Sequence, residues 1–210
     1  MKQETKKNKP EKISPAVKWI IIILAVIAIT FIISYAYNKY QNKAEFDEQH
    51  KEYNYFTFEK DGIHWRTTWV SNNQPYNIKM RHWPGELEDI EITGSLNQMF
   101  NNSQNIYLTF NPVGENLDYV AVAAVELSLN INKALKRNII ISCLVNETAD
   151  CEVRPIVTCD DNDKAVIYLK ESEEPKVILS GNCMIIEGSK EDIVKSTERI
   201  LYVWYGIMPR

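Results

Sequence analysis

The chain has 210 residues, of which 45% are apolar, and its formal net charge is −4. The charge is unevenly distributed: residues 1–18 contain six lysines, residues 19–38 contain no charged residue, and residues 40–210 carry 17 Lys and Arg against 26 Asp and Glu, a net of −9. These figures exclude a plain cytosolic globular protein. They also argue against a nucleic-acid partner, because the acidic C-terminal part would be repelled by phosphates.

The uncharged run at residues 19–38 predicts one transmembrane helix. Eleven positions between residues 20 and 33 are Ile, Leu, Val or Phe, and about 20 helical residues span the roughly 30 Å of a hydrocarbon core. Trp19 and a group of tyrosines around Tyr37 are typical of the two membrane interfaces. By the positive-inside rule, the basic tail of residues 1–18 is expected in the cytoplasm and residues 40–210 outside the cell membrane.

A cleaved signal peptide is the alternative interpretation of this segment. The apolar core at residues 20–33 has the length of a signal peptide, and Ser34-Tyr35-Ala36 places small residues at the −3 and −1 positions. The aromatic residues after Ser34 and the long basic head favour an uncleaved signal-anchor. Both interpretations export the same domain.

The exported part is predicted to begin with a stalk and an antiparallel meander. Residues 39–54 are polar and are expected to form the stalk or a helical continuation, followed by an extracytoplasmic domain over residues 55–210. Asp61-Gly62 is typical of a type I′ hairpin turn, which would place Glu59 opposite His64 and Phe58 opposite Trp65. Alternating residues at 76–81 and 90–93 would add the third and fourth strands.

The second half of the domain has a strand–helix–strand pattern. Strands at residues 106–110 and 138–144 flank a helix at 117–136 that is apolar over most of its circumference. A long crossover of this kind predicts a parallel, right-handed unit.

Short strands and a last helix are expected to complete the domain. The strands are predicted at residues 153–159, 165–169, 177–179 and 183–186. The helix is expected to be capped by Ser189 and Asp192 and to run to about Tyr205. The predicted fold class is therefore α+β or α/β: a meander followed by a thioredoxin-like or similar sandwich, on one N-terminal transmembrane helix.

Four cysteines lie within a short stretch of the exported part, at Cys143, Cys151, Cys159 and Cys183. Outside the cytosol an even number predicts disulfides. Three connectivities are open, and we favour Cys143–Cys151 with Cys159–Cys183 because each closes a short loop beside predicted strands. A zinc site fits poorly because there is no CxxC knuckle, and the same absence argues against thiol–disulfide catalysis.

Three groups of residues are candidate sites, each with a structural alternative. His64, Arg66, Lys79 and Arg81 would share the polar face of the meander and could bind an anion; the alternative is a solvated face with cross-strand ion pairs to residues such as Glu59.

The acidic run at residues 159–163 could bind Ca²⁺, although it lacks the spacing of a calcium loop, or could be an acidic turn. Glu126, alone in an apolar helix, is either functional, or one polar edge of the helix, or paired with Arg154 or Arg137. Asn101 and Asn146 begin N-x-S/T sequons and are candidate glycosylation sites.

Catalytic motifs are absent from the sequence: there is no GxSxG, HExxH or Walker A pattern. Gly188-Ser189-Lys190 resembles part of a phosphate loop but is better explained as a helix cap. We therefore expect no catalytic residue, no cofactor and no metal ion.

The second half of the chain resembles uncharacterised single-pass membrane proteins of archaea. The residues that carry this resemblance lie between 105 and 208: Arg154-Pro155-Ile156-Val157-Thr158-Cys159-Asp160, Ile167-Tyr168-Leu169, Gly181-Asn182-Cys183 and Tyr205-Gly206-Ile207-Met208. The resemblance implies an exported, disulfide-bearing domain on an N-terminal anchor, and it implies no activity.

The function expected from the sequence is that of a membrane-anchored extracytoplasmic binding or envelope-structural module with a protein or glycan partner. The alternative is an extracytoplasmic enzyme or redox accessory with a thioredoxin-like domain. A small subunit of a membrane complex is a third possibility, although residues 19–38 lack a GxxxG motif.

Overall fold

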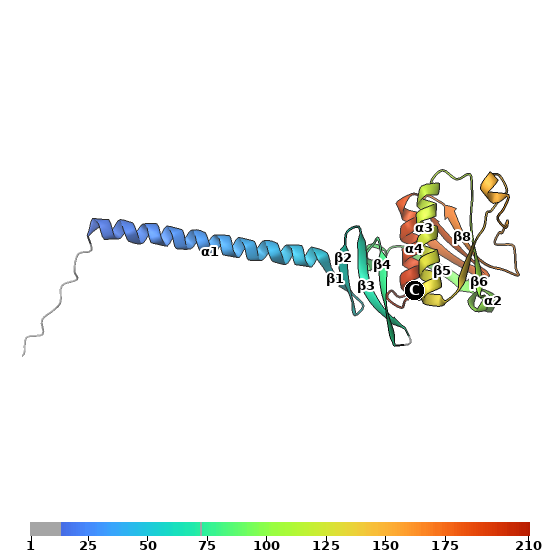
Figure 1. Cartoon of the computed structure of the whole chain (residues 1–210), viewed down its shortest axis with the longest axis horizontal. Coiled ribbons are helices and arrows are strands. Elements are labelled where there is room, and N and C mark those ends of the chain that lie inside the picture. Colours follow the sequence, from blue (N-terminus) through green and yellow to red (C-terminus); the bar gives the residue numbers. More distant parts are fainter. Residues whose placement is uncertain (1–13, 72) are drawn as a thin grey trace, which may run out of the picture. The chain divides into compact units, whose positions relative to one another are not determined.

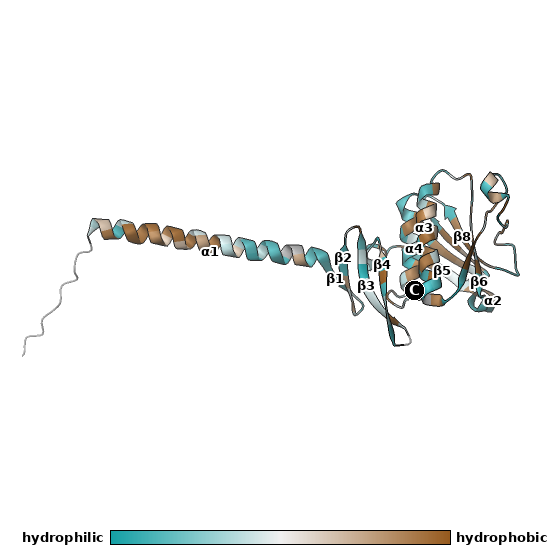
Figure 2. Ribbon diagram, viewed as in Figure 1, coloured by the Kyte–Doolittle hydropathy of each residue, from teal (hydrophilic) through white to brown (hydrophobic). Residues whose placement is uncertain are grey.

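The computed structural model describes residues 14–71 and 73–210, which divide into an N-terminal helix and a folded domain that starts at Gln49 (Figure 1). The helix, α1 (Pro15–Gln49), is the only one among the described residues that is long and apolar enough to cross a membrane. Its apolar residues lie in its first half, and hydrophilic residues follow (Figure 2). The polar segment after the apolar run is therefore helical as far as Gln49.

The first part of the domain is a four-stranded antiparallel sheet, which we call the meander. Its strands are β1 (His50–Tyr53), β2 (Phe56–Asp61), β3 (His64–Ser71) and β4 (Gln74–Met80), paired in that order. β1 was not expected, because residues 39–54 were predicted to be a stalk. The predicted start of the domain at residue 55 is thus too late, since β1 is hydrogen-bonded to β2.

The predicted β2–β3 hairpin exists, but its register differs by two residues. Asp61 faces His64 and Glu59 faces Arg66, so the predicted pairs Glu59–His64 and Phe58–Trp65 are wrong. A type I′ turn centred on Asp61-Gly62 needs a positive φ at both residues, whereas only Gly62 has one, at +64°. Because the shift is an even number of residues, Phe58 and Trp65 remain on the buried face.

The second part of the domain is a six-stranded mixed sheet. Its strands are β5 (Glu91–Leu96), β6 (Asn105–Phe110), β7 (Asn138–Ile141), β8 (Ala165–Glu171), β9 (Lys176–Gly181) and β10 (Cys183–Gly188), in the order β5-β9-β10-β8-β6-β7. All neighbours are parallel except β9 and β10. The predicted parallel strand–helix–strand unit is confirmed as β6, α3 (Leu117–Asn130) and β7.

Three sequence predictions for this part of the domain are wrong. The strand expected at 90–93 belongs to β5, which pairs with β9 and not with the meander. Residues 153–159 form no strand, and only a single bridge joins Ile156 to Cys143. Ser189 does not cap the last helix, α4 (Glu191–Trp204), by its side chain; its carbonyl oxygen accepts a hydrogen bond from the N–H of Asp192.

Short helical segments complete the chain. They are the 3₁₀ helices Pro84–Glu86 and Ala149–Cys151, the helix α2 (Gln98–Asn102), and a π-helical turn at Ile131–Leu135 that continues α3. These short segments lie between the strands and long helices in the sequence, and α3 and α4 cover the six-stranded sheet.

Helices α3 and α4 lie between the meander and the six-stranded sheet (Figure 1). Phe58 of the meander meets Tyr202 of α4 with ring centroids 5.9 Å apart, while α4 packs on β10 from its other side. All residues from 196 to 202 are consequently buried. One core cluster joins the meander, both helices and the inner face of the six-stranded sheet.

The opposite face of the six-stranded sheet has a much smaller core. Its buried members are Val157, Val166 and Cys183, with partly buried residues such as Tyr107 packed around them. Residues 142–164 contribute Val157 to this face and contain no β-strand.

Candidate functional site

The chain that leaves β4 brings Arg81 and His82 against helix α4. Glu198, which is 0% exposed, accepts hydrogen bonds from the backbone N–H of Arg81 and from the backbone N–H of His82 at 2.9 Å. Its carboxylate also lies 2.6 Å from Nδ1 of His82, and Glu191 lies 3.1 Å from Nε2. Burial alone would lower the pKa of His82, but the hydrogen bonds and charges of these two carboxylates outweigh it and raise the pKa.

Glu126 joins this cluster from helix α3. Its Oε1 lies 3.0 Å from Nε of Arg81, and no donor lies within hydrogen-bond distance of its buried Oε2. Burial, together with the charge of Glu198 and a hydrogen bond with it, raises the pKa of Glu126 to about 8. Because the carboxyl group of Glu126 is buried close to Glu198, its neutral form is favoured.

These five side chains form one network, which we call the charge network: Arg81, His82, Glu126, Glu191 and Glu198. Its centre, His82 and Glu198, is buried, whereas Glu191 is exposed and Arg81 is partly exposed. With a proton on Glu126 and a charged His82, the charge network holds two positive and two negative groups and is neutral. Tyr202 adds a hydrogen bond from its hydroxyl to the carbonyl oxygen of His82 at 2.8 Å. The charge network joins the end of β4 to α3 and α4, and Glu198 at its centre is closed to solvent.

Sequence reasoning found only part of the charge network. Glu126 was singled out, but its predicted partners Arg154 and Arg137 are wrong, and Arg81 takes their place. Glu198 was missed because the apolar residues of α4 predict a helix with one buried face. The meander and the six-stranded sheet together bury both faces of α4, and the sequence of α4 has no periodic pattern that predicts the second buried face.

The outer face of α3 exposes an apolar line, which we call the α3 ridge: Ala121, Val125 and Leu129. These residues are four positions apart and therefore lie in one line along the helix. Val125 is 57% exposed and Leu129 is 65% exposed. Most other large apolar side chains of the two helices are buried in the core.

Two depressions flank the α3 ridge and share Leu129. The first, depression A, has a volume of about 340 Å³ and is lined by His64, Arg81, Ala121, Val122, Val125, Glu126 and Leu129. The second, depression B, has a volume of about 640 Å³ and is lined by Ser128, Leu129, Asn132, Lys133, Lys136, Ile139 and Ile141. The α3 ridge and depression A form a largely apolar surface, and depression B adds a mixed surface in which apolar residues stand beside two lysines.

The structure separates the four residues of the candidate anion site. Arg66 is 2.9 Å from Glu59, and Lys79 is 2.7 Å from Asp61, on the exposed face of the meander. Arg81 turns to Glu126 and, with His64, lines depression A. Three of the four are thus already paired with carboxylates, and anion binding by this set stays a prediction.

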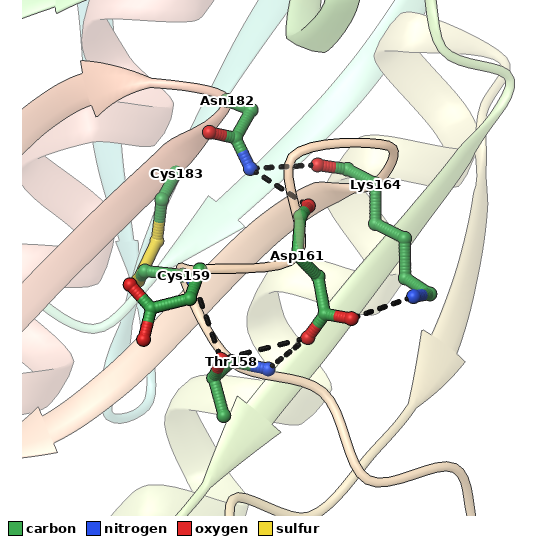
Figure 3. The surroundings of a disulfide bond; sticks show 7 residues. Thr158, Cys159, Asp161, Lys164, Asn182 and Cys183 are labelled. Atoms are coloured by element: carbon green, nitrogen blue, oxygen red, sulfur yellow. Dashed lines mark hydrogen bonds and ion pairs between the residues drawn. A yellow bond between two sulfur atoms is a disulfide. The ribbon is translucent and has the colours of Figure 1, made fainter.

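The acidic run 159–163 forms a closed turn (Figure 3). Asp161 accepts hydrogen bonds from the backbone N–H of Thr158 and from Nζ of Lys164, both at 2.8 Å, and the latter bond lowers the pKa of Asp161. The side chain of Asn182 donates to the carbonyl oxygens of Asp161 and Lys164. Within the described ranges, no group of three or more His, Cys, Asp or Glu residues is arranged to hold a metal ion.

The cysteines pair as predicted, Cys143 with Cys151 and Cys159 with Cys183. The second disulfide joins the acidic turn to the start of β10 (Figure 3). The sequon residues Asn101 and Asn146 are both exposed, and their glycosylation stays a prediction.

No protein-family model, curated protein or solved structure matches this chain. The resemblance to archaeal single-pass membrane proteins consequently stays a prediction. The function of the chain has to be inferred from its own geometry.

Proposed function

We propose that this protein is a single-pass membrane-anchored module whose domain lies outside the cytoplasm and binds another protein. The apolar first half of α1 is long enough to anchor the chain, and the six lysines before residue 19 favour a cytoplasmic N-terminus. The two disulfides support an oxidising compartment for the domain.

The α3 ridge is the observation that carries the binding function. Exposed apolar surface that is continuous and edged by polar residues is typical of protein-binding sites. Val125 and Leu129 stand on a helix that is held rigidly between two sheets, so a partner would meet a preformed surface. Fully burying such aliphatic side chains contributes about 1.5–3 kcal/mol each.

The enzymatic or thioredoxin-like redox alternative lacks a supporting observation. A redox accessory needs a reactive thiolate, and all four cysteines of the sequence are in disulfides. The carboxyl groups of Glu126 and Glu198 lie close together, and Glu198 is closed to solvent. The binding module is therefore the better supported of the two functions.

Site-specific photo-crosslinking in native membranes tests this proposal. A photoreactive amino acid is placed at Val125 or at Leu129 of the full-length protein, and at Val113 or Ile63 as matched controls. The controls are similarly exposed, at 53% and 67%, and lie outside the α3 ridge. We expect one discrete protein adduct from the ridge positions and none from the controls.

Two outcomes would contradict the proposal. Equal adducts from ridge and control positions would indicate unspecific contact. Adducts with lipid alone would show that the ridge meets the membrane surface and not a protein partner.

A further inference from the structure

β7 is an edge strand of the six-stranded sheet, and its outer side is open. The N–H of Asn138 donates to Gln104 at 2.9 Å and that of Ser142 to Leu108 at 2.8 Å, so the even-numbered residues bond toward β6. The backbone groups of Ile139 and Ile141 therefore point outward. Among the described residues no strand pairs with that side.

The chain itself already adds to this edge, one position further along. Cys143 donates its N–H to the carbonyl oxygen of Pro155, and Val157 donates to the carbonyl oxygen of Cys143, both at 3.0 Å. This is the hydrogen-bond pattern of a parallel strand, reduced to a single bridge. The edge is thus accessible to an extended chain, and the stretch of Ile139 and Ile141 is left uncovered.

Depression B lies beside the open stretch of β7. It is lined by the apolar residues Ile139, Ile141 and Leu129 and by the basic residues Lys133 and Lys136. A strand added to β7 would place every second side chain over this depression. An apolar side chain there would contact Leu129 and the two isoleucines.

The two lysines favour acidic side chains in such a strand. Nζ of Lys133 lies 3.4 Å from the carbonyl oxygen of Asn77, and Nζ of Lys136 lies 5.5 Å from the centre of the Tyr76 ring. Within the described part of the chain, neither lysine is in an ion pair with a carboxylate. They are therefore free to attract one in a partner.

We propose that β7 binds an extended segment of a partner protein by strand addition, with an apolar side chain in depression B and carboxylates beside Lys133 and Lys136. This deepens the proposed function and rests on it, since depression B continues the α3 ridge through Leu129. Main-chain hydrogen bonds to Ile139 and Ile141 would supply affinity, and depression B would supply specificity. A flexible, extended segment fits the short open edge better than a second copy of the chain. If two copies paired through β7, residues 155–157 of one copy, which occupy the outer side of Cys143, would approach the Ile131–Leu135 turn of the other.

Fluorescence anisotropy with the full-length protein in detergent micelles tests this proposal. The probe is a labelled synthetic peptide of alternating glutamate and valine. We expect it to bind the wild type and to bind Ile141→Pro at least about tenfold more weakly, since loss of one main-chain donor together with a steric block exceeds about 1.4 kcal/mol. Proline at residue 141 removes an outward N–H and leaves the bonds between β7 and β6 intact, and Ile141→Val is the matched control.

A double variant keeps the test valid if Ile141→Pro fails to fold. Lys133→Glu combined with Lys136→Glu changes only exposed charges at depression B. This variant should lose the glutamate–valine peptide and gain a lysine–valine peptide of the same length. A peptide of the same sequence that is N-methylated at every residue should not bind any form.

The outcomes separate this inference from the proposed function. Equal binding of the N-methylated peptide, or of folded Ile141→Pro, would overturn strand addition. Dimerisation of the wild type that Ile141→Pro abolishes would also overturn it, because the occupant would be a second copy. Failure of every peptide, with the crosslinks at Val125 and Leu129 retained, would overturn only the role of β7.

Discussion

The two faces of the six-stranded sheet are stabilised in different ways. The inner face packs on α3 and α4, which also pack on the meander, in one continuous core with the charge network inside it. The apolar cluster on the outer face has three buried members among the described residues, Val157, Val166 and Cys183. This face is covered by residues 142–164, which contain three of the four disulfide cysteines; the fourth is Cys183. Where little apolar surface can be buried, covalent links take over part of the stabilisation.

The largest effect is expected on the inner face, from Glu198→Ala. The substitution removes the acceptor of three hydrogen bonds and leaves His82 buried beside unsatisfied N–H groups. Breaking a buried pair in this way costs about 3–5 kcal/mol. Urea unfolding followed by tryptophan fluorescence measures it, with the exposed Glu174→Ala as the control; equal midpoints for the two variants would contradict a stabilising role for the charge network.

The next effect is expected on the outer face, from the disulfides. Replacing Cys159 and Cys183 by serine should lower the free energy of unfolding by about 3 kcal/mol, and replacing Cys143 and Cys151 by about 2 kcal/mol, because the first pair closes the longer loop. Hydrogen exchange should rise mainly in residues 142–164. A rise spread evenly over α3 and α4 would show that the two faces do not differ.

A smaller effect is expected from the titration of Glu126 in the charge network. The pKa of Glu126 is about 8 in the folded protein against an ordinary 4.5, so the folded state binds this proton more tightly and stability falls as pH rises between these values. The loss is about 2 kcal/mol between pH 6 and pH 8. The raised pKa of His82 acts in the same direction, because its charged form is favoured in the folded state and is lost as pH rises.

Glu126→Gln separates the two contributions to this pH dependence. It keeps a neutral hydrogen-bonding side chain and should flatten the dependence of the unfolding free energy on pH, with the part due to His82 remaining. Asp118→Asn removes an exposed carboxylate from the same helix and serves as the control. A slope unchanged by Glu126→Gln would place the responsible proton elsewhere.

The smallest effect is expected from the exposed ion pairs of the meander. A double-mutant cycle on Arg66 and Glu59 should give a coupling energy below about 1 kcal/mol, because both side chains are open to solvent and salt. The same cycle on Arg81 and Glu126 should give a larger value above pH 8, where Glu126 is ionised. Equal coupling energies would remove the contrast between buried and exposed charges.

Features that depend on local sequence were predicted well. Four features follow from residues that are close in the sequence: the apolar length of α1, the alternation that buries Phe58 and Trp65, the parallel β6–α3–β7 unit and the two short disulfide loops. Each needs only a period, a length or a short separation.

Features that depend on distant partners were not predicted. β1 was predicted as part of a stalk because its four residues are mostly polar, and its strand conformation depends on pairing with β2. β5 was assigned to the wrong sheet because a short strand does not encode which sheet it joins. The Arg81–Glu126 pair is separated by 45 residues and the contacts of His82 with Glu198 by 116. The α3 ridge was missed because its residues look like core residues until the packing of the helix is known.

We propose that the domain lies outside the cytoplasm on an uncleaved anchor. The most direct test is to label intact cells with a membrane-impermeant amine reagent and to map the modified lysines by mass spectrometry. The domain lysines Lys79 and Lys170 have half-exposed side chains and should be labelled. Lysines of residues 1–18 should remain unmodified yet be recovered in the same intact chain. Labelling of the N-terminal lysines with protection of the domain, or a mature chain that begins near Tyr37, would contradict this topology.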